Sequence, residues 1–283
     1  MNVIIYLSGG LGNQLFQFSY GEYIRANYKC NVSFDISYYR DRGFRRFSLP
    51  DIGITVPIVS PIRSKILFEI DNSRRYRYLR NVAGALSCGK YVTMHEKTGV
   101  DVTEGPRSRE VMLVGYWQDV EYAVYAKAKL LNAIDICCSL GNLVPEPACA
   151  VHIRRGDYLS KKVRGKMSIL DVDYYMGAIN YLRSKNGPVP VVIFSDDRKY
   201  ACEFAKTIDN AVVFQGGAAG SDVSEFMMMK KFSLHVISNS TFSWWAAFLA
   251  NNGEGSVVMP GRWRVDGVDA VRRLFCNGWK VLE

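Results

Sequence analysis

The stretch Cys149-Ala150-Val151-His152-Ile153-Arg154-Arg155-Gly156-Asp157-Tyr158 decides the fold that this sequence predicts. Its apolar residues run directly into two guanidinium groups and a carboxylate, as in a buried strand that ends at a polar cleft. In open α/β sheets, ligands bind outside the carboxyl ends of the strands. Side chains alternate along an extended backbone, so one of Arg154 and Arg155 can enter the cleft while the other braces it. Arginine binds phosphate bidentately, although a salt bridge to Asp157 explains the charges equally well.

Strands and helices alternate after this stretch. Further strands are expected at 191–195, 212–214, 235–238 and 257–259, the last of these being the final strand of the chain. Helices are expected at 174–183, from Asp197 to about 206, at 225–232 and at 244–250. This alternation predicts a parallel, Rossmann-like sheet.

Three of the strands end in polar clusters, namely His152–Asp157, Ser195–Asp197 and Asn239–Ser243. The carboxyl ends of parallel strands share one edge of the sheet, so the clusters should meet there. The third cluster begins a helix and carries the hydroxyl groups of Ser240, Thr241 and Ser243. These hydroxyls and the backbone N–H groups suit either phosphate binding or helix capping. Capping is the simpler explanation for that segment alone, but with Arg154 opposite, a pyrophosphate explains it better.

A strand is expected first, at 3–7. It is followed by the glycine loop Ser8-Gly9-Gly10-Leu11-Gly12-Asn13-Gln14, and then by a helix that ends at about residue 28. Backbone N–H groups at such a helix start form a general anion site. The loop is not a Walker loop, and Leu15 stands where the dinucleotide fingerprint has its last glycine. A tight turn for close packing explains Gly10 and Gly12 as well as a substrate role does.

The remaining pattern sets the domain division. Strands are expected at 32–35 and 112–117 and a helix at 120–131, whereas residues 36–110 give no clear pattern. Residues 141–147 carry the Gly, Asn and Pro signals of a linker. With a soft prior of ~150 residues per domain, we expect two domains, at 1–145 and 146–283.

Composition narrows the class of protein. Hydrophobic residues make up 48% and charged residues 22%, as in an ordinary globular chain. No stretch reaches the ~20 apolar residues of a membrane span, and no signal peptide precedes the first strand, so we expect a cytoplasmic protein. The seven cysteines are never spaced C-x-x-C, which indicates reduced thiols. The three histidines lack neighbouring ligands, so no zinc site is expected.

The net charge of +9 includes basic clusters at 42–46 and 74–80. Such clusters indicate nucleic acid, an anionic membrane surface, a phosphate-bearing substrate or simply a solvated surface. No zinc-finger, bZIP or RNP-type pattern accompanies the charge, so nucleic acid is the least favoured partner.

Three motifs together resemble the α-1,2-fucosyltransferases of glycosyltransferase family eleven: Gly9–Gln17, H-x-R-R-G-D-Y at 152–158 and S-N-S-T-F-S-W-W at 238–245. They occur in family order near the start, middle and end of the chain. The resemblance implies a GT-B-type α/β fold, in which two Rossmann-like domains with parallel sheets face across a cleft. The N-terminal domain would then lie on the acceptor side and the C-terminal domain would bind GDP-fucose. The implied reaction is inverting transfer of L-fucose from GDP-β-L-fucose to O2 of a terminal galactose, with no metal or other cofactor.

The resemblance also implies residue roles. Arg154 resembles the arginine that holds the donor β-phosphate, with His152 as the histidine beside it. Asn13 resembles the loop asparagine near the reacting centre of protein O-fucosyltransferases. The phosphate-binding segment is matched by Ser240, Thr241 and Phe242.

The nucleotide has further candidate contacts. Glu225 falls where relatives place an aspartate that reads guanine, and Asp222 is a near rival. Asp196 and Asp197 either flank the nucleotide or cap the helix that follows.

The implied mechanism needs a base for the acceptor hydroxyl and charge stabilisation for departing GDP. Arg154 and the helix start at Ser240–Ser243 supply fixed positive charge. Asp157 is the candidate base and equally a structural partner for Arg155. If no carboxylate reaches the hydroxyl, Asn13 only orients the acceptor.

Two alternative functions remain open. Asp171-Val172-Asp173 is a D-x-D, the metal-binding signature of GT-A enzymes, but Asp171 or Asp173 more simply caps the helix at Tyr174. A non-catalytic sugar-nucleotide or glycan-binding module is the second alternative, with Tyr76 and Tyr78 stacking on sugar rings. For an enzyme, the acceptor would be an oligosaccharide, lipid-linked in bacterial relatives, so peripheral contact with an anionic inner membrane is expected.

Overall fold

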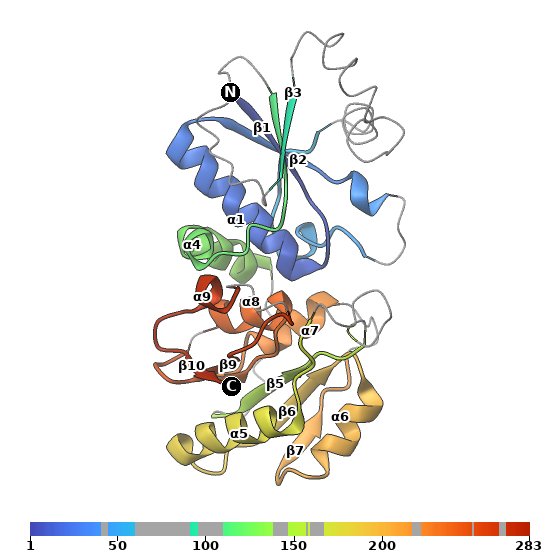
Figure 1. Ribbon diagram of the computed structural model, residues 1–283, viewed down its shortest axis with the longest axis vertical. Helices are drawn as coiled ribbons and strands as arrows, with labels where there is room; N and C mark the ends of the chain where they lie inside the picture. Colours follow the sequence, from blue (N-terminus) through green and yellow to red (C-terminus); the bar gives the residue numbers. More distant parts are fainter. Residues whose placement is uncertain are drawn as a thin grey trace. The chain divides into compact units, whose positions relative to one another are not determined.

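The computed structural model describes residues 1–40, 45–59, 110–137, 147–156, 158, 167–216, 222–250, 252–265 and 270–283, and the backbone of 91–95. The chain divides into two compact units, Met1–Cys137 and Cys138–Glu283 (Figure 1). Most of the expected linker, residues 141–146, lies outside the described residues, as do the basic cluster at 74–80 and the tyrosines within it.

The first unit contains a four-stranded parallel sheet in the order β2-β1-β4-β3. Its strands are β1 (Asn2–Tyr6), β2 (Asn31–Asp35), β3 (Tyr91–His95) and β4 (Glu110–Val114). Among the described residues of this unit, the helices are α1 (Leu11–Tyr28) and α4 (Val120–Cys137), which pack against each other. Short 3-10 turns lie at Ser37–Tyr39 and Pro50–Ile52. The predicted strand at 112–117 is therefore shifted, since it ends at Val114.

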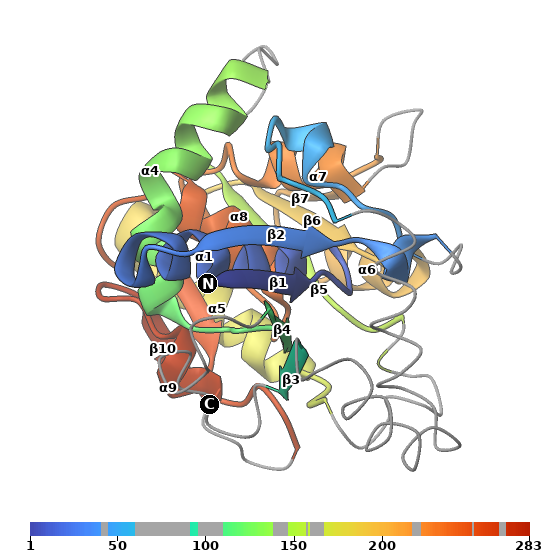
Figure 2. The same ribbon diagram turned by 90° about the horizontal axis from the view of Figure 1, so that it is seen from above.

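The second unit contains a six-stranded parallel sheet in the order β10-β9-β8-β5-β6-β7. Its strands β6 and β7 lie side by side in Figure 2. Its strands are β5 (Cys149–Ile153), β6 (Val191–Ser195), β7 (Ala211–Val213), β8 (Leu234–Val236), β9 (Val257–Pro260) and β10 (Lys280–Leu282). Its helices are α5 (Val172–Asn186), α6 (Arg198–Ala205), α7 (Asp222–Met229), α8 (Thr241–Leu249) and α9 (Ala270–Leu274). Two α/β units with parallel sheets confirm the predicted fold class.

One prediction for this sheet was wrong. The strand at 257–259 is not the final one, because β10 follows α9 and pairs in parallel with β9, with Lys280 opposite Val258. Only two adjacent residues of this edge strand are apolar, Val281 and Leu282, and neither is fully buried, so it shows no readable apolar run.

The central strand β5 is buried along its whole length between β6 and β8. Its alternate residues Cys149, Val151 and Ile153 join a core cluster with residues of α5 and α6. His152 points to the opposite face, where its ring lies 5.6 Å from that of Phe242 in α8. Helices therefore cover both faces, which explains the continuous apolar run at 149–151.

Within the described residues, no helix is long and apolar enough to cross a membrane.

In the first unit, α1 lies so close to the sheet that Gly21 leaves no room for a side chain. A Cβ atom there would come within 2.8 Å of Phe34 Cζ and 3.0 Å of Ile5 Cδ1. Gly177 in α5 is the opposite case, since a Cβ there would meet no heavy atom within 4 Å.

Gly21→Ala and Gly177→Ala should therefore change stability in opposite directions. Alanine gains about 1 kcal/mol of helix propensity at either position, but at Gly21 overpacking costs about 1–3 kcal/mol. Urea denaturation followed by circular dichroism should show lower stability for Gly21→Ala and higher stability for Gly177→Ala. Stabilisation by both variants would contradict the close contact of α1 with the sheet.

Candidate functional site

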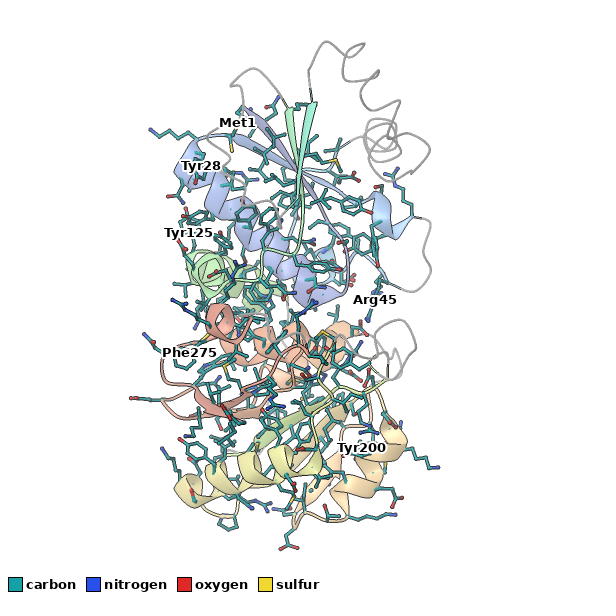
Figure 3. The ribbon with its side chains drawn as sticks, in the orientation of Figure 1. Met1, Tyr28, Arg45, Tyr125, Tyr200 and Phe275 are labelled. Atoms are coloured by element: carbon teal, nitrogen blue, oxygen red, sulfur yellow. The ribbon has the colours of Figure 1, made fainter. Side chains whose placement is uncertain are left out.

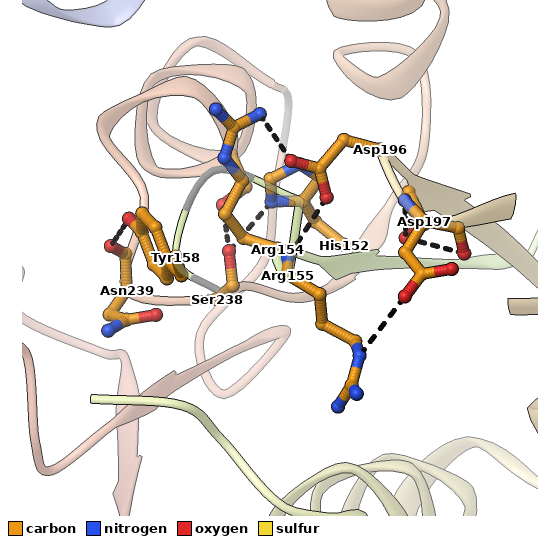
Figure 4. A network of polar contacts seen from close by, with 10 residues as sticks. His152, Arg154, Arg155, Tyr158, Asp196, Asp197, Ser238 and Asn239 are labelled. Atoms are coloured by element: carbon orange, nitrogen blue, oxygen red, sulfur yellow. Dashed lines mark hydrogen bonds and ion pairs between the residues drawn. The ribbon is translucent and has the colours of Figure 1, made fainter. Parts of the chain in front are cut away.

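Three polar segments meet at one edge of the second sheet. Strands β5, β6 and β8 are adjacent and parallel, with Ile153 opposite Ser195 and Val151 opposite Val236. The segments after these strands consequently lie side by side, as Figure 4 shows for His152, Arg154, Asp196 and their neighbours. The predicted meeting of the three clusters is confirmed.

The carboxylate of Asp196 holds Arg154. Its Oδ2 lies 3.0 Å from Arg154 Nη1, and its Oδ1 accepts a hydrogen bond from the Arg155 backbone N–H at 2.9 Å. A Cβ atom on Gly156 would come within 2.8 Å of Asp196 Oδ2. A side chain at residue 156 would therefore displace the Asp196 carboxylate.

Arg155 is the bracing arginine. Its Nε lies 3.4 Å from Asp197 Oδ2 (Figure 4). Its guanidinium stands 3.9 Å from the ring centroid of Tyr200, which is labelled on α6 in Figure 3. Asp197 Oδ1 also accepts from the Tyr200 N–H and caps α6. Arg155 thus pairs with Asp197, where the sequence offered Asp157 as its partner. Asp157 lies outside the described residues.

His152 is buried beneath these arginines. Its Nδ1 shares a hydrogen bond of 2.7 Å with Ser238 Oγ. Burial, and then the nearby charge of Arg154, lower the pKa of His152 to about 3. The imidazole is therefore neutral at physiological pH, and it adds no positive charge to the site.

Asn239 and Ser195 hold the site together internally. Asn239 Nδ2 donates to the carbonyls of Ser168 and Trp263 at 2.7 and 2.8 Å, and Tyr158 donates to the Asn239 carbonyl. Ser195 Oγ accepts from the Asp197 N–H. Both residues thus have a structural role, and a ligand contact by Asn239 or Ser195 stays a prediction.

The start of α8 supplies the third part of the site. Ser240 precedes the helix, but its side chain makes no capping hydrogen bond, so capping does not explain this hydroxyl. Ser243 Oγ is buried and donates to the Ser240 carbonyl at 3.2 Å. The dipole of α8 places partial positive charge at this helix start.

Glu225 of α7 shares the electrostatic environment of this edge. Burial, followed by Asp222 and Asp196, raises its pKa, and Arg154 opposes that rise. Asp222 opens the same helix. The pKa of Glu225 therefore responds to both Arg154 and Asp196, which places this carboxylate in the field of the arginine site.

Asp171 has a structural role in α5. Its Oδ1 accepts from the Tyr174 N–H at 3.0 Å and caps the helix. Asp173 follows in the first turn. The capping interpretation of this D-x-D is confirmed.

In the first unit, the glycine loop connects β1 to α1. Gly9 has φ +83°, and a Cβ there would lie 2.5 Å from Asn13 Nδ2. Gly10 stands at the helix N-cap, and Gly12 is buried in the first turn. Arg45 lies next to the loop, because a Cβ on Gly10 would be 3.5 Å from Arg45 Nη1.

Two buried glutamines, which the sequence reasoning did not single out, hold this loop. Gln14 donates to the carbonyls of Gly9 and Arg46 and accepts from the Ser48 N–H. Gln17 accepts from the Ser8 N–H and donates to the Tyr6 and Gly115 carbonyls. Their available signal was a pair of amides, three residues apart, among the apolar positions of α1.

Residues 55–282 match the family model of Glycosyl transferase family 11. The chain belongs to this family. It is therefore a glycosyltransferase, and the resemblance carried by the three motifs is confirmed.

Two relatives from Escherichia coli resemble this family 11 glycosyltransferase over most of their length. It is 27% identical to an alpha-1,2-colitosyltransferase over 274 residues, which cover 92% of each chain. It is also 27% identical to the O-antigen biosynthesis glycosyltransferase WbnK over 286 residues, covering 91% of this chain and 93% of that one. The galactoside 2-alpha-L-fucosyltransferase SEC1 of Bos taurus is 31% identical over 125 residues, which cover 44% of this chain and 33% of SEC1.

A solved structure has a similar fold. The fucosyltransferase NodZ from Bradyrhizobium aligns with a TM-score of 0.52 and 13% identity, covering 88% of this glycosyltransferase and 92% of NodZ. At this identity the likeness concerns the fold alone, and it agrees with the expected GT-B-type class.

The charges around Glu225 yield a test of the site that needs no substrate. Arg154→Gln removes a cation that favours the carboxylate, so it should raise the pKa of Glu225. Asp196→Asn removes a competing anion, so it should lower that pKa. ¹³C NMR titration of the Glu225 carboxyl group measures both changes. If both variants moved the pKa in the same direction, Glu225 would not lie in the field of both groups.

Proposed function

We propose that this glycosyltransferase transfers L-fucose from GDP-β-L-fucose to O2 of a terminal galactose of an oligosaccharide, forming an α-1,2 linkage with inversion. The observation that carries the proposal is Arg154, held by Asp196 at the carboxyl end of β5. The names of the α-1,2-colitosyl and galactoside 2-α-L-fucosyl relatives support the linkage.

The donor diphosphate would bind between Arg154 and the start of α8. A guanidinium has five N–H donors, so Arg154 can keep its bond to Asp196 and still donate to phosphate oxygens. The first N–H groups of α8 and the Ser240 and Thr241 side chains supply further donors. Neutral His152 supports this segment through Ser238 rather than through charge.

The guanine base would bind near Glu225. Guanine presents two adjacent donors, N1–H and N2–H, which match the two oxygens of an ionised carboxylate. Glu225 is partly buried, so such a bond would be shielded from water.

Departure of GDP develops negative charge at the β-phosphate, where Arg154 and the helix dipole of α8 stand already oriented. In this proposal these fixed charges do the work that a metal ion does in other glycosyltransferases, so no metal is required. Asp157 remains the proposed base, and the Asn13 amide orients the acceptor. Inversion follows because a single displacement brings the hydroxyl to the face opposite GDP.

The colitosyltransferase relative makes L-colitose the alternative sugar. Colitose lacks the 3-hydroxyl group of fucose, so an assay with both GDP-sugars decides between the two donors.

The proposal is tested by incubating the protein with GDP-fucose and β-galactosides of differing linkage, with and without EDTA. NMR of the product should show α-1,2-linked fucose, formed equally in both conditions. Arg154→Ala should reduce kcat by about 10²-fold or more, because it removes a preoriented charge from the leaving group. Arg198→Ala, which removes an exposed arginine from the same unit, is the matched control and should keep its activity.

Three results would overturn the proposal: binding of GDP-fucose without transfer to any galactoside, activity lost in EDTA and restored by a divalent metal, or normal turnover by Arg154→Ala.

The raised pKa of Glu225 predicts a pH dependence for GDP binding. Only the ionised carboxylate accepts both guanine protons, so affinity should fall as the pH falls through the raised pKa. Glu225→Gln removes this titration and should weaken binding at neutral pH by roughly 10-fold, the loss of one charge-assisted hydrogen bond. Calorimetry with GDP at several pH values measures both effects. If Asp222→Asn instead flattened the pH profile, the guanine contact would belong to Asp222.

A further inference from the structure

The segment after β4 lies along one face of α1. Gly115 accepts a hydrogen bond of 2.7 Å from Gln17, Trp117 stacks on Tyr20 with centroids 4.2 Å apart, and Gln118 Nε2 donates to Asn13 Oδ1 at 3.0 Å. Positions 13, 17 and 20 recur at the spacing of a single helix face. Gln118 is thus delivered to Asn13 by a chain segment that has two other attachments to the same helix.

Trp117 adopts a strained backbone conformation at this place. Its φ is +53°, in the left-handed region that bulky residues rarely occupy, and the residue is 7% exposed. Such a conformation costs of order 1–3 kcal/mol and persists only where the surroundings hold it. The nearly parallel stack on Tyr20, at an interplanar angle of 14°, provides that hold next to Gln118.

The hydrogen bond from Gln118 fixes the orientation of the Asn13 side-chain amide, that is, the directions in which its oxygen and its nitrogen point. Because Gln118 donates, it takes the Asn13 oxygen, and the amide nitrogen turns towards Gly9 and the loop. Gly9 leaves the space for this arrangement, since any Cβ there would lie 2.5 Å from Asn13 Nδ2. Without the bond, rotation of the side-chain amide would exchange the donor and acceptor ends.

We propose that Gln118 is a positioning residue, which orients the Asn13 amide so that its N–H group, on the side of the glycine loop, and not its oxygen, is presented to the acceptor sugar. This inference rests on the proposed function, in which Asn13 orients the acceptor. In this proposal Gln118 acts only through its bond to Asn13. Its effect appears in turnover, because a reacting group displaced by about 1 Å can lose about 10²-fold in rate.

Two nearly isosteric variants separate this role from packing. Gln118→Met keeps the length of the side chain but cannot donate. Gln118→Glu keeps the shape, but as a carboxylate it accepts from Asn13 and turns the amide around. We expect a 10- to 100-fold loss of kcat in both variants, at least as large in Gln118→Glu, with unchanged affinity for GDP and an unchanged melting temperature.

A double-mutant cycle with Asn13→Ala gives the decisive measurement. If Gln118 acts through Asn13, Gln118→Met should change kcat less than twofold once Asn13 is alanine. Asn27→Ala, which removes an exposed asparagine farther along α1, is the matched control and should leave kcat and the effect of Gln118→Met unchanged. Additive losses in the cycle, or full activity of both Gln118 variants, would overturn the proposal.

An NMR readout separates this inference from the proposed function. The side-chain amide signals of Asn13, identified by their loss in Asn13→Ala, should shift in Gln118→Met whether or not fucose is transferred. If the wild-type protein transfers no fucose, the proposed function is refuted, and the hydrogen bond between Gln118 and Asn13 can have no effect on that reaction. Unshifted amide signals refute the positioning itself, even in an active enzyme.

Discussion

The site in the second unit depends on the interactions of the Asp196 carboxylate with Arg154 and Arg155. One oxygen pairs with the Arg154 guanidinium and the other accepts the Arg155 N–H, so a single side chain holds both a charge and the backbone that carries it. The Arg154 and Asp196 side chains are 19% and 25% exposed, so water screens their pair only in part. The geometry exists because residue 156 has no side chain to push the carboxylate away.

Beneath this charged edge lies a layer of neutral hydrogen bonds. His152, Ser238 and Ser243 form a buried chain, and Asn239 links three segments through its amide and its carbonyl. A charged group in this layer would pay a large desolvation cost, which is also why the pKa of His152 falls so low. The site therefore combines rigidity from uncharged groups below with charge confined to the rim, where a ligand can meet it.

The first unit uses the same principle with amides. Gln14 and Gln17 each satisfy both ends of their amide groups on backbone atoms of the loop and of neighbouring segments. Gln118 extends this pattern to a side chain, since it fixes the Asn13 amide rather than a backbone group. Amides suit this purpose because one planar group both donates and accepts, and it carries no charge that must be compensated.

Local patterns in the sequence determined a large part of this protein. The apolar runs and the glycine and proline signals predicted the strands β1, β5 and β6 and the parallel class, and the joint motifs predicted family 11. These features are readable because they depend on neighbours within a few residues. The same holds for the cap at Asp171, which needs only the three residues that follow it.

Only the tertiary structure decided the partners of the site residues. The register that sets Ile153 opposite Ser195 also brings Arg154 and Arg155 to Asp196 and Asp197, more than forty positions away in the chain. Other features also depend on strands and helices that are distant in sequence. They are the hydrogen bond from Asn239 to the Ser168 carbonyl, the absence of a capping bond from the Ser240 side chain, and the raised pKa of Glu225. A hydrogen bond or an ion pair is decided by which atoms come within about 3 Å. In a parallel sheet, that depends on the pairing of strands separated by whole helices.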